Sequence, residues 1–186
     1  MDQPIENYGK LRLVDLKTAL ETNNFDVYLA ENKQGACKIV LEDIIPKLNA
    51  KTISWGGSMT FMATGLYQQL KENPNLKVLD TFDKEIPAEE MLERRRQSLL
   101  VDLFITGTNA VTETGQLVNL DMIGNRIGAL TFGPKWVIVM VGRNKIAADL
   151  DEAMFRVKNY AAPVNSMRLD KKTPCVKTSY CQECKS

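Results

Sequence analysis

The sequence predicts an α/β fold with a mainly parallel sheet, helices on both faces and an inserted hairpin. From residue 25 to residue 141, short apolar runs alternate with stretches whose apolar residues recur at helical spacing. This alternation is typical of βαβ units, whose right-handed crossovers cover both faces of a parallel sheet with helices. One polar segment breaks the pattern, because residues 111–112 and 117–118 flank the turn-forming sequence Glu113-Thr114-Gly115-Gln116. We expect this hairpin to be inserted into the α/β sheet.

Length and charge narrow the class of protein. A chain of 186 residues is long enough for one good core, and its 44% apolar and 25% charged residues are ordinary for a globular protein. The net charge of +1 argues against broad electrostatic binding to nucleic acid. No apolar stretch approaches the roughly 20 residues of a membrane span, and the first residues lack the regions of a signal peptide. We therefore expect a cytoplasmic protein without membrane insertion.

Histidine is absent from the chain. Its absence excludes nucleophile pairs built on histidine and every histidine-containing metal site. Any general acid or base must then be Asp, Glu, Lys, Cys or Tyr.

The expected elements of the first half follow the apolar spacing in order. We expect helices over residues 6–21, 37–48 and 59–72, and strands over residues 25–30, 51–55 and 76–82. The second helix has the clearest stripe, since Cys37, Val40 and Leu41 begin a series at i, i+3 and i+4 spacing. Cys37 is therefore expected to be a packed core thiol.

In the second half, a helix is expected after Pro87, and apolar strands at residues 103–107 and 136–141. Asp149 and Glu152 resemble a capping pair for a last helix, which Pro163 should end. We expect residues 1–169 to form one α/β domain and residues 170–186 to form a cysteine-bearing tail. Ile53, Val78, Ile105 and residues 137–139 should lie in central strands.

A glycine turn follows the strand at residues 51–55. Gly56, Gly57, Ser58 and Thr60 lie where a strand ends and a helix begins. Glycines let the backbone approach a ligand, and the N–H groups of a helix N-terminus favour anions such as phosphate or carboxylate. The alternative is a plain turn with a serine cap.

The segment from residue 103 to residue 145 places many polar side chains between two apolar strands. The carboxyl ends of parallel strands line the ligand crevice of α/β sheets. Glu113 is a candidate base or nucleophile and Lys145 a candidate catalytic cation; the alternatives are a solvated hairpin tip and an exposed loop lysine. We expect both to face the same crevice as the glycine turn. The further ligand-binding candidates here are Thr106, Gly107, Asn109, Asn119, Asp121, Asn125, Arg126 and Asn144.

The tail carries a Cys-x5-Cys-x2-Cys pattern at Cys175, Cys181 and Cys184. Thiolates at such spacing bind Zn²⁺ or an iron–sulfur cluster. Three cysteines are one ligand short, so the fourth would be Cys37, a carboxylate, an exogenous ligand, a partner's side chain or a residue beyond Ser186. We expect the tail to lie outside the core, ordered by packing on the domain or by a metal, because it has few apolar side chains.

Several separated motifs resemble one family. Residues 54–60 (Ser-Trp-Gly-Gly-Ser-Met-Thr), residues 106–115 (Thr-Gly-Thr-Asn-Ala-Val-Thr-Glu-Thr-Gly) and residues 141–145 (Val-Gly-Arg-Asn-Lys) occur in the order typical of LUD-domain proteins. This lactate-utilisation family is related to the third component of the bacterial lactate-oxidation complex. The resemblance implies a fold similar to the NagB, ribose-5-phosphate isomerase and CoA-transferase group. The resemblance also implies that the protein acts together with iron–sulfur oxidoreductase subunits, and it is compatible with a homo-oligomer.

Three hypotheses on function remain open at this point. The first is an accessory or regulatory component of lactate or related organic-acid oxidation that binds a small anionic metabolite. The second is an enzyme acting on a phosphorylated or CoA-linked small molecule. The third is an electron-transfer partner that carries zinc or an iron–sulfur cluster on the tail cysteines.

Overall fold

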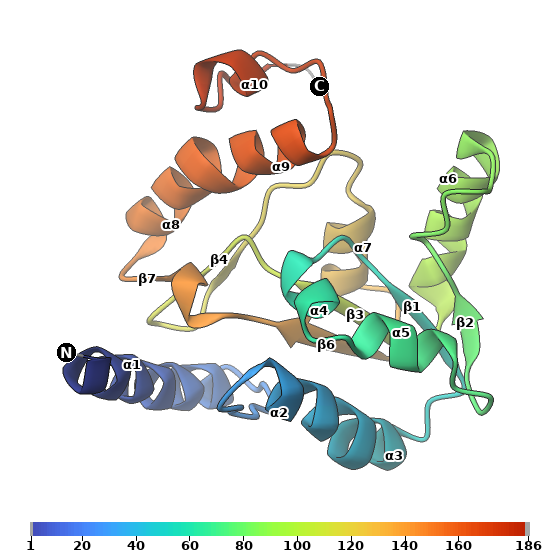
Figure 1. Ribbon diagram of the computed structural model, residues 1–186, viewed down its shortest axis with the longest axis horizontal. Helices are drawn as coiled ribbons and strands as arrows, with labels where there is room; N and C mark the ends of the chain where they lie inside the picture. The colour runs from blue at the N-terminus through green and yellow to red at the C-terminus, as the bar shows by residue number, and fades with distance from the viewer. Residues whose placement is uncertain (1, 185–186) are drawn as a thin grey trace. The chain divides into compact units, whose positions relative to one another are not determined.

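A computed structural model describes residues 2–184, and contacts within the chain divide it into two compact units. Unit 1 comprises residues 1–28, 108–122 and 142–186, and unit 2 comprises residues 29–107 and 123–141. Each unit has its own sheet and its own buried cluster, so each is described by itself (Figure 1).

Unit 2 contains a four-stranded parallel sheet in the order β2-β1-β3-β6 (Figure 1). Its strands are β1 (Thr52–Trp55), β2 (Lys77–Leu79), β3 (Leu103–Gly107) and β6 (Trp136–Met140). The predicted α/β architecture is confirmed. The prediction of four central strands is wrong for two of them, because β2 and β6 each pair with one neighbour and Val78 and residues 137–139 lie at the sheet edges.

Helices cover both faces of this sheet, as expected. Alternate strand residues point to opposite faces. Ile53, Trp55 and Ile105 pack into a core cluster with Cys37 and Leu66 from the helices of one face. On the other face, Phe104 packs with Val101 and Ala129, and Val137 packs against them. The helical segments of unit 2 are α2 (Lys33–Lys38), η1 (Ile39–Ile44), α3 (Ile45–Leu48), α4 (Met59–Ala63), α5 (Leu66–Lys71), α6 (Ala88–Gln97), η2 (Ser98–Leu100) and α7 (Asn125–Thr131).

Two helices of unit 2 are less regular than their apolar stripes predict. The expected helix at 59–72 divides into α4 and α5 because Gly65 adopts φ +75°, a conformation that glycine allows at little cost. The expected helix at 37–48 contains the π-helical segment η1, and Cys37 is buried as predicted.

The predicted strand at residues 25–30 is wrong. These residues form no strand, and the side chains of Phe25, Tyr28 and Leu29 are 41%, 43% and 43% exposed. Strand propensity in a short apolar run has little effect without a neighbouring strand to supply hydrogen bonds.

Unit 1 contains a three-stranded sheet in the order β5-β4-β7. The predicted hairpin forms between β4 (Ala110–Thr112) and β5 (Leu117–Val118), and β4 also pairs in parallel with β7 (Ile146–Ala147). The hairpin therefore belongs to this second sheet and not to the parallel sheet of unit 2. The helical segments of unit 1 are α1 (Asp2–Thr22), η3 (Arg143–Lys145), α8 (Leu150–Arg156), η4 (Val157–Ala161), α9 (Ala162–Arg168) and α10 (Cys175–Thr178).

The last helix begins as predicted but does not end at Pro163. Asp149 caps α8, since its Oδ1 accepts a hydrogen bond from the Glu152 amide at 2.8 Å. The π-helical segment η4 then leads into α9, which begins with Pro163 in its first turn and runs to Arg168. The chain stays helical up to Pro163, and the π-helical turn of η4 before it accommodates the proline ring.

At the amino-terminal ends of the strands in unit 2, Asp102 connects the start of β1 to the start of β3. Its Oδ1 lies 2.8 Å from Lys135 Nζ, and its Oδ2 accepts hydrogen bonds from the amides of Lys51 and Thr52 at 3.0 and 2.9 Å. The Lys135 contact and these amides hold the pKa of Asp102 well below its ordinary value. A lowered folded-state pKa contributes stability above the unfolded value of about 4, and this contribution is lost as the pH falls below it.

We therefore predict that Asp102→Asn lowers the free energy of unfolding by about 1–3 kcal/mol at pH 7, since the side chain loses the negative charge that Lys135 and the two amides contact. The variant should also lose less stability than the wild type between pH 5 and pH 2. Urea titrations across this pH range measure both effects. Asp26→Asn, at an exposed position, is the control; an equal effect of the two substitutions would contradict the assignment.

Candidate functional site

The glycine turn between β1 and α4 packs against β3 within unit 2. The Gly56 amide donates to the Ile105 carbonyl at 2.9 Å, and a Cβ on Gly56 would lie 3.0–3.1 Å from the Phe104 ring and Thr106 Oγ1. Ser58 Oγ accepts from the Phe61 amide at 3.2 Å, so Ser58 is the N-cap of α4. The glycine turn therefore packs closely against the end of β3.

Gly107, the last residue of β3, contacts this turn on one side and a buried arginine on the other. A Cβ on Gly107 would lie 2.6 Å from Ser58 Oγ. Arg126, the second residue of α7, donates from Nη1 to the Gly107 carbonyl at 3.3 Å and is only 7% exposed. We refer to Gly56, Gly57, Ser58, Gly107 and Arg126 as the strand-end cluster. A guanidinium binds carboxylates and phosphates through two parallel hydrogen bonds, so this cluster has a group suited to an anion.

Other predicted residues of unit 2 lie around this cluster in different settings. Thr106 is fully buried in β3. Thr60 is the second residue of α4 and Asn125 the first of α7, and both are half-buried.

In unit 1, the turn at residues 108–109 receives two cationic side chains. Lys145 Nζ donates to the Thr108 carbonyl at 2.9 Å, and Arg156 Nε donates to the Asn109 carbonyl at 3.2 Å. The Asn109 amide donates to Asn119 Oδ1 at 3.3 Å, which ties the turn to the end of β5. Three predicted residues, Asn109, Asn119 and Lys145, therefore lie together. Arg156 was missed, because a single arginine in a helix gives no sequence signal of its target.

Glu113 lies at the exposed hairpin tip and pairs with α1. Its Oε1 is 2.8 Å from Arg12 Nε and 2.6 Å from Arg12 Nη2, and the Glu113 amide donates to the Ala147 carbonyl at 2.9 Å. The carboxylate is thus oriented by Arg12, a residue that the sequence did not single out. Asp121 is half-buried and Asn144 is exposed. The prediction that Glu113 and Lys145 share a crevice with the glycine turn concerns both units and stays a prediction.

Asp80, directly after β2, is a second residue that the sequence did not single out. It is 7% exposed. Burial would raise the pKa of Asp80, but hydrogen bonds from Phe82, Tyr67, Lys71 and Trp55 outweigh burial and hold the pKa below its ordinary value. Asp80 is therefore a charged group inside unit 2, close to the glycine turn.

The tail cysteines do not form a metal-binding group in the described structure. Cys175 is buried at the start of α10, and its hydrogen bond with Thr173 lowers the pKa of the thiol. Cys181 is half-buried, Cys184 is exposed, and both are free thiols. Among residues 2–184, no three Cys, Asp or Glu side chains are grouped so that they could hold a metal ion. The arrangement of these described residues does not fit zinc or an iron–sulfur cluster, and metal binding by the tail stays a prediction.

Protein contacts hold the tail on η4. The Cys181 amide donates to the Lys158 carbonyl at 2.8 Å, and Lys158 forms an ion pair with Glu183. These contacts attach the segment at Cys181 and Glu183 to η4.

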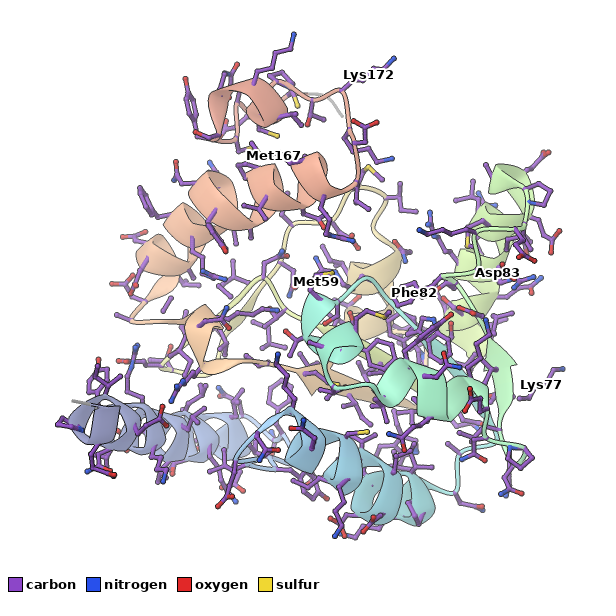
Figure 2. All side chains as sticks on the ribbon, viewed as in Figure 1. Met59, Lys77, Phe82, Asp83, Met167 and Lys172 are labelled. Carbon is purple, nitrogen blue, oxygen red and sulfur yellow. The ribbon has the colours of Figure 1, made fainter. Side chains whose placement is uncertain are left out.

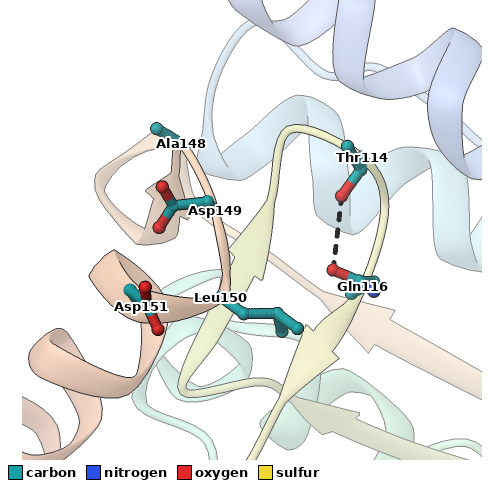
Figure 3. Close-up of a pocket in the computed structure, with 6 residues that line it drawn as sticks. All are labelled: Thr114, Gln116, Ala148, Asp149, Leu150 and Asp151. Carbon is teal, nitrogen blue, oxygen red and sulfur yellow. Dashed lines mark hydrogen bonds between the residues drawn. The ribbon is translucent and has the colours of Figure 1, made fainter.

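Two open pockets have linings that include none of the predicted site residues. Figure 3 shows one of about 310 Å³ in unit 1, between the hairpin tip and the start of α8. It is lined by Thr114, Gln116, Ala148, Asp149, Leu150 and Asp151, and Thr114 Oγ1 donates to Gln116 Oε1 at 3.3 Å. The second, of about 330 Å³, lies in unit 2 between β2 and α6 and is lined by Val78, Leu79, Glu90, Glu93, Arg94 and Gln97.

Comparison with known proteins identifies the family. The family model of the LUD domain matches residues 13–185. No curated protein and no solved structure matches the chain. Within residues 2–184, no helix is long and apolar enough to cross a membrane. Since the match covers nearly the whole chain, the protein belongs to the LUD-domain family, which is associated with lactate utilisation.

Proposed function

We propose that this protein is an accessory or regulatory component of lactate or related organic-acid oxidation, and that it binds a small carboxylate at the strand-end cluster. Family membership supports the metabolic role. The main observation in favour of a ligand site is the buried guanidinium of Arg126, which donates a hydrogen bond to the Gly107 carbonyl. Gly107 in turn packs on Ser58. Such a component works beside iron–sulfur oxidoreductase subunits, as the family resemblance implies.

The donors of the strand-end cluster suit a 2-hydroxy or 2-oxo acid. Arg126 supplies the positive charge for a carboxylate. Ser58 Oγ accepts from the Phe61 amide, so its own hydrogen can be donated to a ligand oxygen. Gly57 is exposed, and apart from its two chain neighbours no heavy atom of the described residues lies within 4 Å of the position a Cβ would take, which leaves its backbone open to approach.

Calorimetric titration with L-lactate, D-lactate, pyruvate and inorganic phosphate tests this proposal. We predict saturable binding of at least one carboxylate to the wild type. Arg126→Lys should weaken it by about tenfold or more, because a lysine keeps the charge but loses the paired donors. Arg96→Ala is the control, since Arg96 is an exposed arginine of α6 paired with Glu93.

The proposal fails if the wild type binds none of these compounds. It also fails if Arg126→Lys, folded by circular dichroism, binds as tightly as Arg96→Ala. Tighter binding of phosphate than of any carboxylate would favour the second candidate function.

That second candidate is an enzyme acting on a phosphorylated or CoA-linked molecule, and one observation favours it. Lys145 and Arg156 direct two positive charges to adjacent carbonyls of one turn in unit 1. Two cations close together suit a phosphate group. Turnover of such substrates, abolished in both Glu113→Gln and Lys145→Met, would support the enzyme. Retained turnover in Glu113→Gln would exclude the carboxylate from the chemistry.

A further inference from the structure

Asp80 receives four hydrogen bonds, all from unit 2. Its Oδ1 accepts from Trp55 Nε1 at 3.1 Å and from the Phe82 amide at 2.8 Å. Its Oδ2 accepts from the Tyr67 hydroxyl at 2.9 Å and lies 3.2 Å from Lys71 Nζ. Four donors from three separate segments thus converge on one buried carboxylate.

This arrangement fixes Trp55, the residue directly before the glycine turn. Asp80 holds its indole, and the hydroxyl of Thr81 donates to its carbonyl at 2.6 Å. Trp55 is fully buried, and its indole N–H needs an acceptor there. Residues 80 and 81 therefore constrain both the side chain and the backbone from which Gly56 continues.

A second connection runs from Asp80 to Ser58 through aromatic rings. Phe82, in the segment between β2 and α6 (Figure 2), donates its amide to Asp80, and its ring centroid lies 6.3 Å from that of Phe61. The Trp55 and Phe61 centroids are 5.7 Å apart. Because the Phe61 amide donates to Ser58 Oγ, the network closes on the hydroxyl at the other end of the turn.

We propose that Asp80 is a positioning residue of the anion site: it holds the glycine turn in the geometry that presents Gly57 and Ser58 to the ligand. This inference rests on the proposed function. Asp80 does not touch the ligand; it acts through Trp55 and Phe82. Only a carboxylate can accept from all four donors, because an asparagine in its place would direct its NH₂ group at two of them.

Asp102, at the amino-terminal ends of the strands in the same sheet, offers a matched control. Asp102 is also an aspartate that accepts several hydrogen bonds, but it holds the start of β1 at Lys51 and Thr52. Asp102→Asn should lower stability without moving the glycine turn. A purely structural role of Asp80 would make the two substitutions equivalent for binding.

The experiment uses the full chain with Trp136→Phe, which leaves Trp55 as the only tryptophan of the two in the sequence. L-lactate and pyruvate are titrated by calorimetry at a temperature where every variant is folded, and Trp55 emission is recorded. We expect Asp80→Asn to weaken binding by about tenfold or more and to shift the Trp55 emission, since about two hydrogen bonds to the carboxylate are lost. Asp102→Asn should keep the affinity within about twofold and leave the emission unchanged.

Thr81→Val is a second, milder variant that keeps the inference testable if Asp80→Asn does not fold. It removes the hydrogen bond to the Trp55 carbonyl and should weaken binding by about threefold or more. Two results would overturn the inference while the proposed function stands: affinity unchanged in Asp80→Asn or Thr81→Val, or an equal loss in Asp102→Asn. If the wild type binds neither acid, or if Arg126→Lys leaves the affinity unchanged, the proposed function itself has failed, and the positioning role falls with it.

Discussion

Phe61→Ala is expected to lower the free energy of unfolding by about 3–5 kcal/mol, the usual loss for a fully buried phenylalanine. The Phe61 side chain is 0% exposed. Its ring contacts those of Trp55, Tyr67 and Phe82 at centroid distances of 5.7, 6.4 and 6.3 Å. Truncation removes apolar burial and leaves a cavity among three rings that cannot close on one another without moving the glycine turn. Urea unfolding followed by circular dichroism measures the loss.

Phe132→Ala provides the matched control, because the same side chain is removed where it is 91% exposed. That substitution should change stability by less than about 0.5 kcal/mol. A small effect at Phe61 would show that the aromatic cluster does not support the turn as described.

Gly107→Ala is expected to lower stability by about 1–3 kcal/mol, because the new methyl group overpacks the end of β3. Its Cβ would lie 2.6 Å from Ser58 Oγ and 3.1 Å from the Met140 carbonyl oxygen. The Met140 oxygen belongs to the backbone and Ser58 Oγ is held as the N-cap of α4, so either the cap is lost or the backbone of the turn or of β6 must shift. Thermal and urea unfolding of the purified variant measure the cost.

A double-mutant cycle tests whether the contact with Ser58 causes this loss of stability. Ser58→Gly in the Gly107→Ala background should recover part of the loss, since the atom at 2.6 Å is removed. Gly57→Ala should be nearly neutral, because apart from its chain neighbours no heavy atom of the described residues lies within 4 Å of its Cβ position. Equal effects of alanine at Gly107 and at Gly57 would contradict the contact between the two strand ends.

The sheet could be predicted because its signals are local. Apolar runs ended by glycine, as in β1 and β3, identify strands without knowledge of their neighbours. The position of a strand in the sheet is not local, which is why Val78 was wrongly expected to be central. Pro163 was misread for a related reason: the π-helical η4 that makes room for it leaves no mark in the sequence.

In the candidate site, too, the features with a local sequence signal could be predicted and the others could not. The glycine turn has a local signature, and Ser58 caps α4 as its residue type suggests. Asp80 has none, because its partners Trp55 and Tyr67 lie 25 and 13 residues away and converge only after folding. The pairing of Arg12 with Glu113, 101 residues apart, could not be predicted for the same reason.

The central claim is that a small carboxylate binds where the glycine turn meets the end of β3. The most direct measurement is an NMR titration of ¹⁵N-labelled protein with L-lactate and pyruvate, followed at the glycine amides. We predict saturable shifts at Gly56, Gly57 and Gly107, with little change at Gly115 in the hairpin, and loss of these shifts in Arg126→Lys. Shifts confined to Gly115 and the pocket residues Thr114 and Asp149, or no shifts at millimolar ligand, would contradict the claim.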